Sequence, residues 1–583
     1  MNKQLFFTVI MFFEFNYCFG QMVEIVWEKN YGGSSSDALF DAIPTSDSSF
    51  IFTGFTESID EDVNTFHGSL DVWICKIDSL GMILWENSYG GTNVDYAGCI
   101  VECTDHGFII SGYSYSNDGD IVVNNGSADC WILKIDSIGN LEWQTSIGGS
   151  QFENATSIIQ TSDSGFIFTG YSHSEDGDLS EHFGSSDVAD LIVFKLDKFG
   201  NILWNRVFGG VYDDFGTSIT ITNDGDYLIC GTTNLYDYFD YWVIKLDSEG
   251  NLIWDKSYGG SEYDVAYAIL ETTNNNILIT GESSSDDGDV EFHHPGENKD
   301  MWTLLLDSVG EIIWQRSLGG AGADEGHSLL ECNDGTYIIA GNTTTLDDGD
   351  VSGHHGGMFY ADYWVVKLDS SGVIKWQKCL GGSNSDFAFS INKSSESSYL
   401  ISGYAWSDDG DITEHYIGDI PATDIWVVQI SETCDQIVYY TDSDNDLFGD
   451  AENYIYSCYD TLGYVWISGD CDDTNPDIYP GAAEILNGLD DDCNGLVDDN
   501  VSVDDLMGGF SIYPNPVKDV LFINNNSGSE ATFTISTLTG QIIYKSDPFS
   551  FNTDLSLSSY SSGLYLITIY TKNNRFLIEL IKE

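Results

Sequence analysis

The stretch KLDSEGNLIW (245–254) decides the fold, because the chain repeats it along most of its length. When Trp27 is taken as the first anchor, the tryptophans that end successive copies lie 58, 58, 61, 50, 60 and 62 residues apart. A repeat of this length is typical of propeller blades or solenoid units. The other copies are KIDSLGMILW (76–85), KIDSIGNLEW (134–143), KLDKFGNILW (195–204), LLDSVGEIIW (305–314) and KLDSSGVIKW (367–376).

Each repeat contains four short segments with the composition of β-strands. Their apolar residues are β-branched or aromatic, the breaks between them are rich in Gly, Asp and Asn, and no segment has a sustained helical period. Four antiparallel strands per repeat, seven times over, predict an all-β fold of the β-propeller type. In the fifth repeat the segments are YAILET (267–272), ILITGES (277–283), MWTLLLD (301–307) and an equivalent of NLIWDKSYGG (251–260).

The seventh repeat lacks its fourth strand, and the N-terminus supplies a candidate. After DIWVVQIS (424–431) no segment ending in GxxxW follows, whereas VEIVWEKNYGG (23–33) has that pattern and no repeat of its own. Pairing the two would close the ring and remove its exposed edges. We therefore predict a seven-bladed β-propeller over residues 22–431, closed by the N-terminal strand.

Two of the repeats also resemble a known family. FGGVYDDFGTSITITNDGDYLICGTT (208–233) and LGGAGADEGHSLLECNDGTYIIAGNT (318–343) are similar to the repeats of secreted bacterial β-propellers. This resemblance implies the fold and no particular activity.

The charge and the N-terminus limit where the chain works. It has 20 basic and 94 acidic residues, a net charge of −74, so we expect no nucleic-acid partner and no anionic membrane surface. The stretch MNKQLFFTVIMFFEFNYCFG (1–20) has Lys3, a short apolar run and then small or polar residues, the pattern of a secretory signal peptide. The run is about half the length that spans a bilayer, so we predict export and no transmembrane segment in the mature chain.

One face of the propeller gathers the unusual loops. Five second-to-third loops contain DGD, at 118–120, 176–178, 287–289, 348–350 and 409–411, and several histidines follow them. These loops could bind cations, or their aspartates could simply order the backbone. The same two interpretations apply to the acidic residue that follows each GG pair: Asp37, Asp95, Glu153, Asp214, Asp264, Asp324 and Asp386.

The fourth repeat breaks the pattern, because its loop is about ten residues shorter and reads TTNLYDYFDYW (232–242). We expect Tyr236, Tyr238, Phe239 and Tyr241 to be exposed there as an aromatic notch. Such a notch could stack on a sugar ring or hold a peptide. Packing within the blade is the alternative.

Residues 432–500 form an acidic module with two calcium-type loops. YYTDSDNDLFGD (439–450) and LDDDCNGLVDD (489–499) both place oxygen-bearing side chains at alternate positions, as a loop that wraps one ion requires. The predicted ligands are Asp442, Asp444, Asp446, Asp450, Asp490, Asp492, Asn494 and Asp498.

This module resembles the MopE-type metal-binding motif of secreted bacterial proteins, with Asn445 and Leu447 where that family has more glycine and Leu486 where it usually has Cys. We predict Ca²⁺, since the ligands are hard oxygens and residues 432–500 contain no His or Met. The module would act as a metal-rigidified spacer. Cys434, Cys458, Cys471 and Cys493 could form two disulfides, whose pairing the sequence leaves open.

The last 74 residues look like a small β-sandwich of about seven strands, here expected to be Ig-like. Tyr513-Pro514-Asn515-Pro516, Gly540 and Gly563-Leu564-Tyr565 closely resemble the type A C-terminal sorting domain of type IX secretion. The resemblance implies the type IX machinery as a partner, passage across the outer membrane, and release or surface attachment. The expected parts are a signal peptide (1–20), the propeller (22–431), the acidic module (432–500), a linker (501–509) and the sorting domain (510–583).

These features favour an exported cell-surface or secreted binding or adhesion protein, stabilised by Ca²⁺, with a glycan or protein ligand. The chain has no GxSxG, HExxH or phosphate-loop motif and only three arginines, so no catalytic residue is assigned. The alternative is a polysaccharide-active hydrolase or lyase that uses carboxylates on the loop face.

Overall fold

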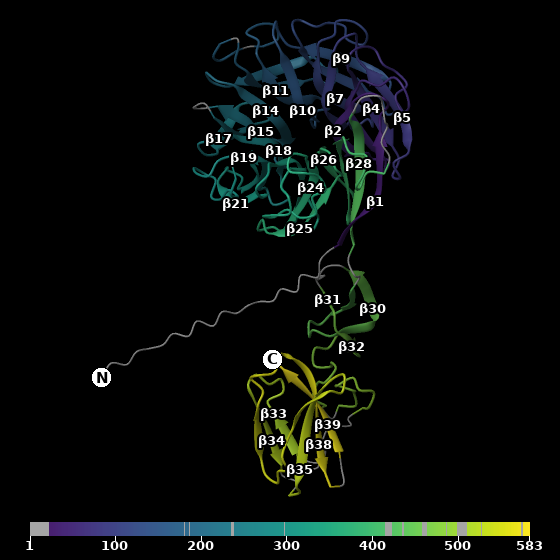
Figure 1. The fold of residues 1–583 in the computed structure, drawn as a ribbon, viewed down its shortest axis with the longest axis vertical. Helices are drawn as coiled ribbons and strands as arrows, with labels where there is room; N and C mark the ends of the chain where they lie inside the picture. Colours follow the sequence, from purple (N-terminus) through teal and green to yellow (C-terminus); the bar gives the residue numbers. More distant parts are fainter. Residues whose placement is uncertain are drawn as a thin grey trace, which may run out of the picture. The chain divides into compact units, whose positions relative to one another are not determined.

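The computed structural model describes residues 22–179, 181–185, 187–234, 238–296, 298–413, 422–433, 437–457, 463–484, 487–497, 510–525, 528–572 and 575–583. All regular secondary structure in these residues is β-strand, so the predicted all-β class is confirmed. The chain divides into two compact units, Met1–Thr433 and Cys434–Glu583 (Figure 1). Among the described residues no helix could cross a membrane. The expected signal peptide lies outside them.

The first unit contains, in its described residues, seven four-stranded antiparallel sheets. Three consist of β2 (Asp37–Pro44), β3 (Phe50–Thr56), β4 (Asp71–Ile77) and β5 (Ile83–Tyr89); β6 (Asp95–Glu102), β7 (Phe108–Ser114), β8 (Asp129–Ile135) and β9 (Leu141–Ile147); and β10 (Glu153–Gln160), β11 (Phe166–Ser172), β12 (Asp190–Leu196) and β13 (Ile202–Phe208).

Three further sheets continue the same order of strands. They consist of β14 (Asp214–Ile221), β15 (Tyr227–Asn234), β16 (Phe239–Leu246) and β17 (Leu252–Tyr258); β18 (Asp264–Glu271), β19 (Ile277–Ser283), β20 (Asp300–Leu306) and β21 (Ile312–Leu318); and β22 (Asp324–Glu331), β23 (Tyr337–Thr343), β24 (Asp362–Leu368) and β25 (Ile374–Leu380).

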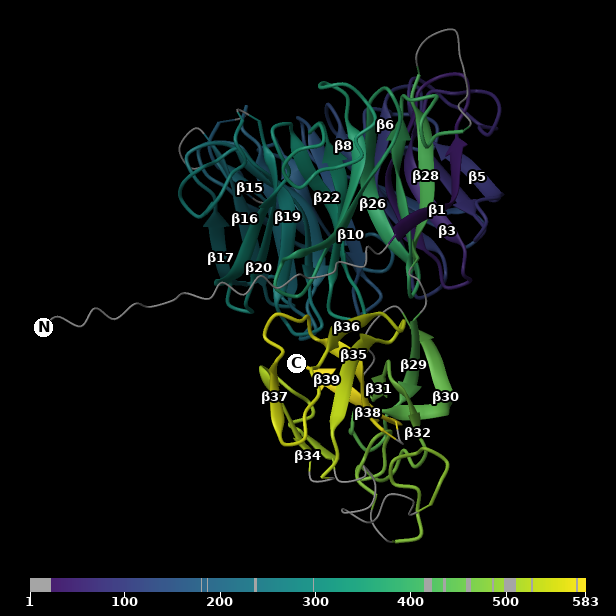
Figure 2. The same ribbon diagram turned by 60° about the horizontal axis from the view of Figure 1, so that its bottom comes forward.

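The seventh sheet joins the two ends of the unit. It contains β26 (Asp386–Ser395), β27 (Ser398–Ala405) and β28 (Asp424–Thr433), and its outer strand is the N-terminal β1 (Met22–Tyr31), which pairs antiparallel with β28. The first strand of each sheet contacts the first strand of the next, from β2 to β26 and back to β2. The sheets therefore surround a common axis in a propeller-like arrangement (Figures 1 and 2).

The repeated decapeptide is the turn between the third and fourth strands. In the copy at 245–254, the Asp247 carboxylate accepts the amides of Glu249 (3.0 Å) and Asn251 (2.7 Å), and Gly250 adopts a φ of 79°. A residue other than glycine is strained in that conformation, which explains the glycine in every copy.

The core lies between neighbouring sheets. The third strands carry fully buried tryptophans, and their hydrophobic clusters combine residues of two successive sheets. In one cluster Val72 and Ile74 of β4 pack with Phe108 of β7 and Trp131 of β8. The fully buried tryptophans, on five of the seven third strands, are Trp73, Trp131, Trp302, Trp364 and Trp426.

The second unit contains two groups of strands. β29 (Ile437–Thr441), β30 (Gly449–Ser457), β31 (Tyr464–Val465) and β32 (Ser468–Asp470) form one small sheet. The C-terminal residues form a three-stranded and a four-stranded sheet around one hydrophobic core. Their strands are β33 (Phe510–Tyr513), β34 (Val520–Asn525) and β37 (Thr553–Ser556), and β35 (Ala531–Thr537), β36 (Ile542–Lys545), β38 (Gly563–Thr571) and β39 (Arg575–Lys582).

Candidate functional sites: an aromatic pocket and two acidic loops

A β-bulge recurs at one position in the first strand of all seven sheets. Each register skips the third residue after the acidic residue that opens the strand, and a bulge turns such an unpaired residue away from the regular alternation of the strand. The sequence did not reveal this, although the fixed offset from the acidic residue marks the position. The skipped residues are Phe40, Gly98, Thr156, Thr217, Tyr267, His327 and Phe389.

Four of these bulge residues form a continuous arc of rings. Ring centroids are 4.7 Å apart for Tyr267 and His327, 5.0 Å for His327 and Phe389, and 5.3 Å for Phe389 and Phe40. The arc crosses three sheet boundaries, including the one where β26 meets β2. On this side of the ring of sheets the bulge residues are therefore aromatic. On the other side the bulge residues Thr156 and Thr217 instead hydrogen-bond to the next sheet.

Phe40, at one end of the arc, also lines a pocket of about 740 Å³. Trp406 and Tyr360 line it and are 47% and 45% exposed, so a ligand would find two accessible rings. Among the lining residues that the structure describes, Glu57 is the one charged side chain, while Asn384, Ser36 and Thr423 add polar groups. The aromatic lining consists of Phe40, Phe55, Tyr360, Tyr404 and Trp406.

Three neighbouring sheets position these residues. Phe55 and Glu57 lie at the end of β3, Tyr404 and Trp406 at the end of β27, and Tyr360 in the loop before β24. The Trp406 amide donates to the Ser385 carbonyl (3.0 Å), and the Glu57 amide donates to the Ser36 carbonyl (3.0 Å). His354 Nε2 lies 3.0 Å from the Tyr360 carbonyl and donates to it.

The aromatic notch expected in the fourth repeat is only partly present. Tyr238 is 40% exposed, and the Phe239 ring lies 5.8 Å from that of Tyr263. Tyr241 is fully buried: its ring lies 4.7 Å from that of Trp302, and its hydroxyl donates to the Trp302 carbonyl (2.8 Å). The expected exposure of Tyr241 is therefore wrong, because its position in β16 directs the side chain into the neighbouring sheet. Tyr236 lies outside the described residues.

The seven acidic residues that open the first strands bind the turns before them. Each is at most 1% exposed. Burial raises the pKa of Asp37 to about 7 and that of Asp324 to about 6, although hydrogen bonds to both carboxylates oppose this. In each sheet the carboxylate accepts, at 2.7–2.9 Å, the amide of Gly33, Gly91, Gly149, Gly210, Gly260, Gly320 or Gly382.

The DGD loops order the backbone through the same turns. Asp118 accepts the Thr92 amide (2.8 Å) and Asp120 accepts the Gly90 amide (3.1 Å). The other DGD loops repeat these contacts; Asp350, for example, accepts the Gly319 amide (3.3 Å). Backbone ordering, one of the two interpretations of the sequence, therefore accounts for these aspartates.

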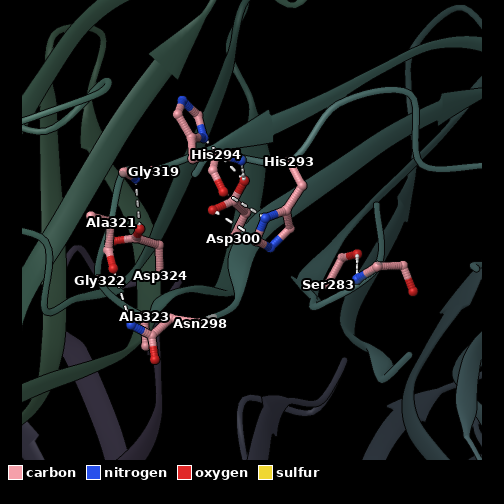
Figure 3. A network of polar contacts seen from close by, with 12 residues as sticks. Ser283, His293, His294, Asn298, Asp300, Gly319, Ala321, Gly322, Ala323 and Asp324 are labelled. Atoms are coloured by element: carbon pink, nitrogen blue, oxygen red, sulfur yellow. Dashed lines mark hydrogen bonds and ion pairs between the residues drawn. The ribbon is translucent and has the colours of Figure 1, made fainter. Parts of the chain in front are cut away.

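Histidines after the loops bind the aspartates that open the third strands. Nδ1 to carboxylate distances are 3.0 Å for His67 and Asp71, 2.8 Å for His182 and Asp190, and 3.0 Å for both His294–Asp300 and His355–Asp362. Figure 3 shows His293 and His294 turned toward Asp300, with Asp324 nearby.

Each of these third-strand aspartates faces an acidic residue of the next sheet. A Cβ on Gly90 would lie 2.7 Å from both Asp71 Oδ1 and Asp95 Oδ2, so the two carboxylates meet across this glycine. Asp71 Oδ1 has no hydrogen-bond partner among the described residues, and burial raises the pKa of Asp71 to about 6. The boundaries between sheets thus contain paired, buried carboxylates.

The first acidic loop gathers three of its four predicted aspartates. Carboxylate oxygens of Asp442, Asp444 and Asp446 lie within 4.8 Å of one another. Asp442 accepts the amides of Asn445 (2.7 Å) and Leu447 (3.3 Å), so the backbone wraps around it. Asp450 is not in the cluster and accepts the Glu452 amide instead.

Asp470, which the sequence did not single out, approaches the first loop. It pairs with Asp450 in the register of β30 and β32. Burial raises its pKa to about 6, and the charges of Asp446 and Asp444 add to the rise. Oδ2 of Asp470, like Oδ2 of Asp444 and of Asp446, has no hydrogen-bond partner among the described residues.

The second acidic loop has a positive φ at the same two positions as the first. Its fourth and sixth residues, Cys493 and Gly495, have φ values of 56° and 92°, and the corresponding Asn445 and Leu447 have 67° and 82°. The sixth position is the one that requires glycine in an EF-hand loop. Leu447 therefore keeps the turn despite the strain that a β-carbon brings there.

The ligand set of this loop differs from the prediction. Oxygens of Asp490 and Asp492 cluster within 4.8 Å with one of Glu484, which the sequence did not indicate. Asn494 accepts the Leu496 amide (2.9 Å), and Asp498 lies outside the described residues. A disulfide joins Cys471 to Cys493, which settles part of the open pairing. Cys434 and Cys458 lie outside the described residues.

Two family models match parts of the chain. One, described as "Secretion system C-terminal sorting domain", matches residues 511–583. Residues 511–583 are a type IX secretion sorting domain. The other, described as "Putative metal-binding motif", is the MopE-type motif and matches residues 470–499, which include the second acidic loop but not the first. Both resemblances are thereby confirmed, and the sorting domain supports export through the type IX machinery. No curated protein matches the chain.

Solved structures match with low identity. Sqt1 from Chaetomium thermophilum is 11% identical over 69% of this chain and 97% of that chain, with a TM-score of 0.37. The PQQ-bound aldose sugar dehydrogenase from Streptomyces coelicolor is 9% identical over 71% and 99%, with a TM-score of 0.31. Hydrazine synthase from Kuenenia stuttgartiensis is 10% identical over 52% and 74%, with a TM-score of 0.35. No function is taken from these propeller-like neighbours.

Proposed function

We propose that the chain is an exported binding protein that acts at the cell surface or after release. In this proposal residues 1–20 are a signal peptide, 22–431 a seven-bladed propeller closed by the N-terminal strand, 432–500 a Ca²⁺-binding spacer, 501–509 a linker and 510–583 an Ig-like sorting domain. The ligand is a glycan or a protein. The sorting domain supports the export, and the arrangement of the sheets supports the propeller.

The aromatic pocket carries the proposed binding activity. Its two exposed rings and polar lining have the character of ligand pockets, and its volume of about 740 Å³ falls within their usual range. Tyr238 and Phe239, at the fourth sheet, are a second contact in the proposal. The pocket is preferred because three sheets build it, whereas the expected notch loses Tyr241 to the core.

Binding of the full chain to arrays of glycans and of surface proteins tests this function. We expect Trp406→Ala to abolish binding, because it removes the most accessible ring of the pocket. Trp466→Ala is the matched control, since Trp466 is 71% exposed but lies in the acidic module. A ligand that Trp406→Ala binds as well as the unaltered chain would place the site elsewhere.

We further propose that each acidic loop binds one Ca²⁺. The first site uses Asp442, Asp444, Asp446 and Asp470; the second uses Asp490, Asp492 and Glu484, with Asn494 and Asp498 as further ligands. Carboxylate oxygens in the first loop that have no hydrogen-bond partner within the described parts of the chain support an ion there. Hard oxygen ligands, in a stretch (432–500) whose sequence has no His or Met, favour Ca²⁺ over a transition metal.

Chelation tests the calcium proposal. An ion that binds only the folded chain must raise its melting temperature, so EDTA is expected to lower it and added Ca²⁺ to restore it. Asp444→Asn should weaken calcium binding by about tenfold or more, since it removes a clustered charge. Asp450→Asn is the matched control, because Asp450 lies outside the cluster. An unchanged melting temperature in EDTA would contradict the proposal.

A polysaccharide-active enzyme is the second candidate, and one observation favours it. Lys299 Nζ binds both Glu282 Oε2 (2.7 Å) and Glu325 Oε1 (2.6 Å), so two carboxylates of neighbouring sheets approach each other. His327 binds Glu325 as well and, with Lys299, lowers its pKa to about 2 against the opposing effect of burial. Release of sugar products by the full chain, and its loss in Glu282→Gln, would establish this alternative.

A further inference from the structure

The lining of the aromatic pocket narrows the chemistry of the ligand. The described residues of this lining include five aromatic rings, one carboxylate and no Lys, Arg or His. We propose that the pocket binds an organic ammonium group, which the rings of Trp406, Tyr404 and Tyr360 surround and Glu57 neutralises. This inference rests on the proposed binding function and specifies the group that is recognised.

The physical reason is the charge distribution of aromatic rings. Their faces are negative, so a cation above them gains about 0.5–1 kcal/mol at an exposed site and about 2 kcal/mol or more when desolvated. An anion gains nothing from the same faces. Aromatic cages of this composition are the usual way in which proteins hold quaternary and methylated ammonium groups.

The loops beside the pocket strengthen the preference for a cation. Asp60, Glu61 and Asp62 follow Glu57, and Asp408, Asp409 and Asp411 follow Trp406. Neither stretch, 57–63 or 406–413, contains a Lys or Arg. The net charge of −74 attracts cations from a distance. A cationic ligand is therefore drawn toward the pocket, and an anionic one is repelled.

An inorganic cation does not fit the same lining. Ca²⁺ takes six to eight oxygen ligands, whereas the described part of the pocket lining offers a single carboxylate. Among the described residues, the clusters of three carboxylates lie in the acidic module instead. The volume of about 740 Å³ also exceeds what an alkylammonium head needs, so the pocket has room for the rest of a larger ligand.

Calorimetry on the full chain tests the inference with defined probes. Choline is compared with 3,3-dimethylbutan-1-ol, which has the same shape and no charge, and both with N-acetyl-lysine methylamide. We expect choline or the lysine derivative to bind at least about tenfold more tightly than the neutral alcohol, and more weakly as salt is added. The better of the two shows whether the natural source is a quaternary ammonium or a lysine side chain.

Variants locate the binding. Glu57→Gln and Trp406→Ala should each weaken binding of the cation by about tenfold or more. Glu249→Gln removes the same charge from an exposed turn of another sheet, outside the lining, and Trp466→Ala removes an exposed tryptophan elsewhere; both should bind normally. Equal affinity for choline and the neutral alcohol overturns the inference, as does the absence of cation binding at millimolar concentration. If neutral glycans bind and Trp406→Ala abolishes that binding, the proposed function stands and only the ammonium inference fails.

Discussion

At the scale of single residues, one salt bridge differs from its repeated counterparts. In several repeats the lysine of the decapeptide binds an exposed carboxylate; Asp47, the partner of Lys76, has a side chain that is 57% exposed. Lys367 instead binds Glu432 at 2.5 Å, and both side chains are 2% exposed. The Tyr399 hydroxyl (3.1 Å) and the Trp376 indole (3.3 Å) also donate to Glu432. This carboxylate comes from the end of β28, so the contact ties two successive sheets together.

We predict that Lys367→Met lowers the free energy of unfolding by about 3–5 kcal/mol, because it leaves a buried carboxylate without its cation. Lys76→Met is the matched change and should cost about 0–1 kcal/mol for the ion pair, since water reaches Asp47. Denaturant midpoints measure both. Lys367→Met combined with Glu432→Gln should recover much of the loss, and equal costs for the two single variants would contradict the prediction.

Single residues also show where sequence reasoning about the site fails. Tyr241 looked like part of an exposed notch, yet its hydroxyl reaches the Trp302 carbonyl 61 positions further along the chain. Which way a strand residue points depends on register, and one bulge reverses it. Phe40 and Phe389 are adjacent because both occupy bulges and because β26 meets β2. The fixed offset from the acidic residue marks the bulges, but no local pattern shows that β26 meets β2.

At the scale of elements, the turns and the order of strands follow from the sequence. The Asp and Gly of KLDSEGNLIW form the turn between the third and fourth strands. Each copy of the decapeptide repeats the same local hydrogen bonds. Arg206 and Arg316 cap such turns of the next sheet through the carbonyls of Gly250 (2.8 Å) and Gly372 (3.0 Å). The pocket was not predictable, because it assembles loops from sheets that lie more than 300 residues apart in the chain.

The N-terminal strand is the element that closes the last sheet. β1 pairs with β28 from Met22–Thr433 to Tyr31–Ile425. Without β1, the backbone groups of β28 would form a long unpaired edge, which promotes association between molecules. We predict that deletion of residues 22–31 lowers the melting temperature and causes aggregation that increases with protein concentration.

A synthetic peptide MVEIVWEKNY (22–31) should restore the melting temperature of the deletion variant, because it can occupy the vacant edge. A peptide of the same composition in scrambled order is the control and should have no effect. A deletion variant that stays monomeric with an unchanged melting temperature would show that β28 needs no partner.

At the scale of the whole molecule, buried carboxylates at the boundaries between sheets make stability depend on pH. Burial raises the pKa of Asp37 to about 7, and it raises to about 6 the pKa values of Asp71, Asp129, Asp190, Asp214, Asp240, Asp324 and Asp386. In the unfolded chain these groups titrate near 3.9. The folded chain therefore binds more protons than the unfolded chain between about pH 4 and pH 7.

Protonation of these carboxylates therefore stabilises the folded chain relative to the unfolded chain. The stabilisation is fully present below about pH 4 and is lost as the pH rises through 6 to 7. Some carboxylates have a lowered pKa in the folded chain; for Asp163 and Glu325 it is about 2. These groups stabilise the folded chain when ionised and lose that contribution only in stronger acid. We predict a higher melting temperature at about pH 5 than at about pH 8, measured by calorimetry without added metal.

Surface repulsion would produce the same trend, since protonation also reduces the net charge of −74. Salt at about 1 M shortens the screening distance to about 3 Å and suppresses repulsion between exposed charges, but it does not reach carboxylates buried between sheets. The pH dependence should therefore persist in high salt. Asp71→Asn should reduce it, because one of the paired carboxylates is removed, whereas Asp78→Asn in the exposed turn of the same sheet should not. A melting temperature that no longer changes with pH in high salt would assign the effect to the surface.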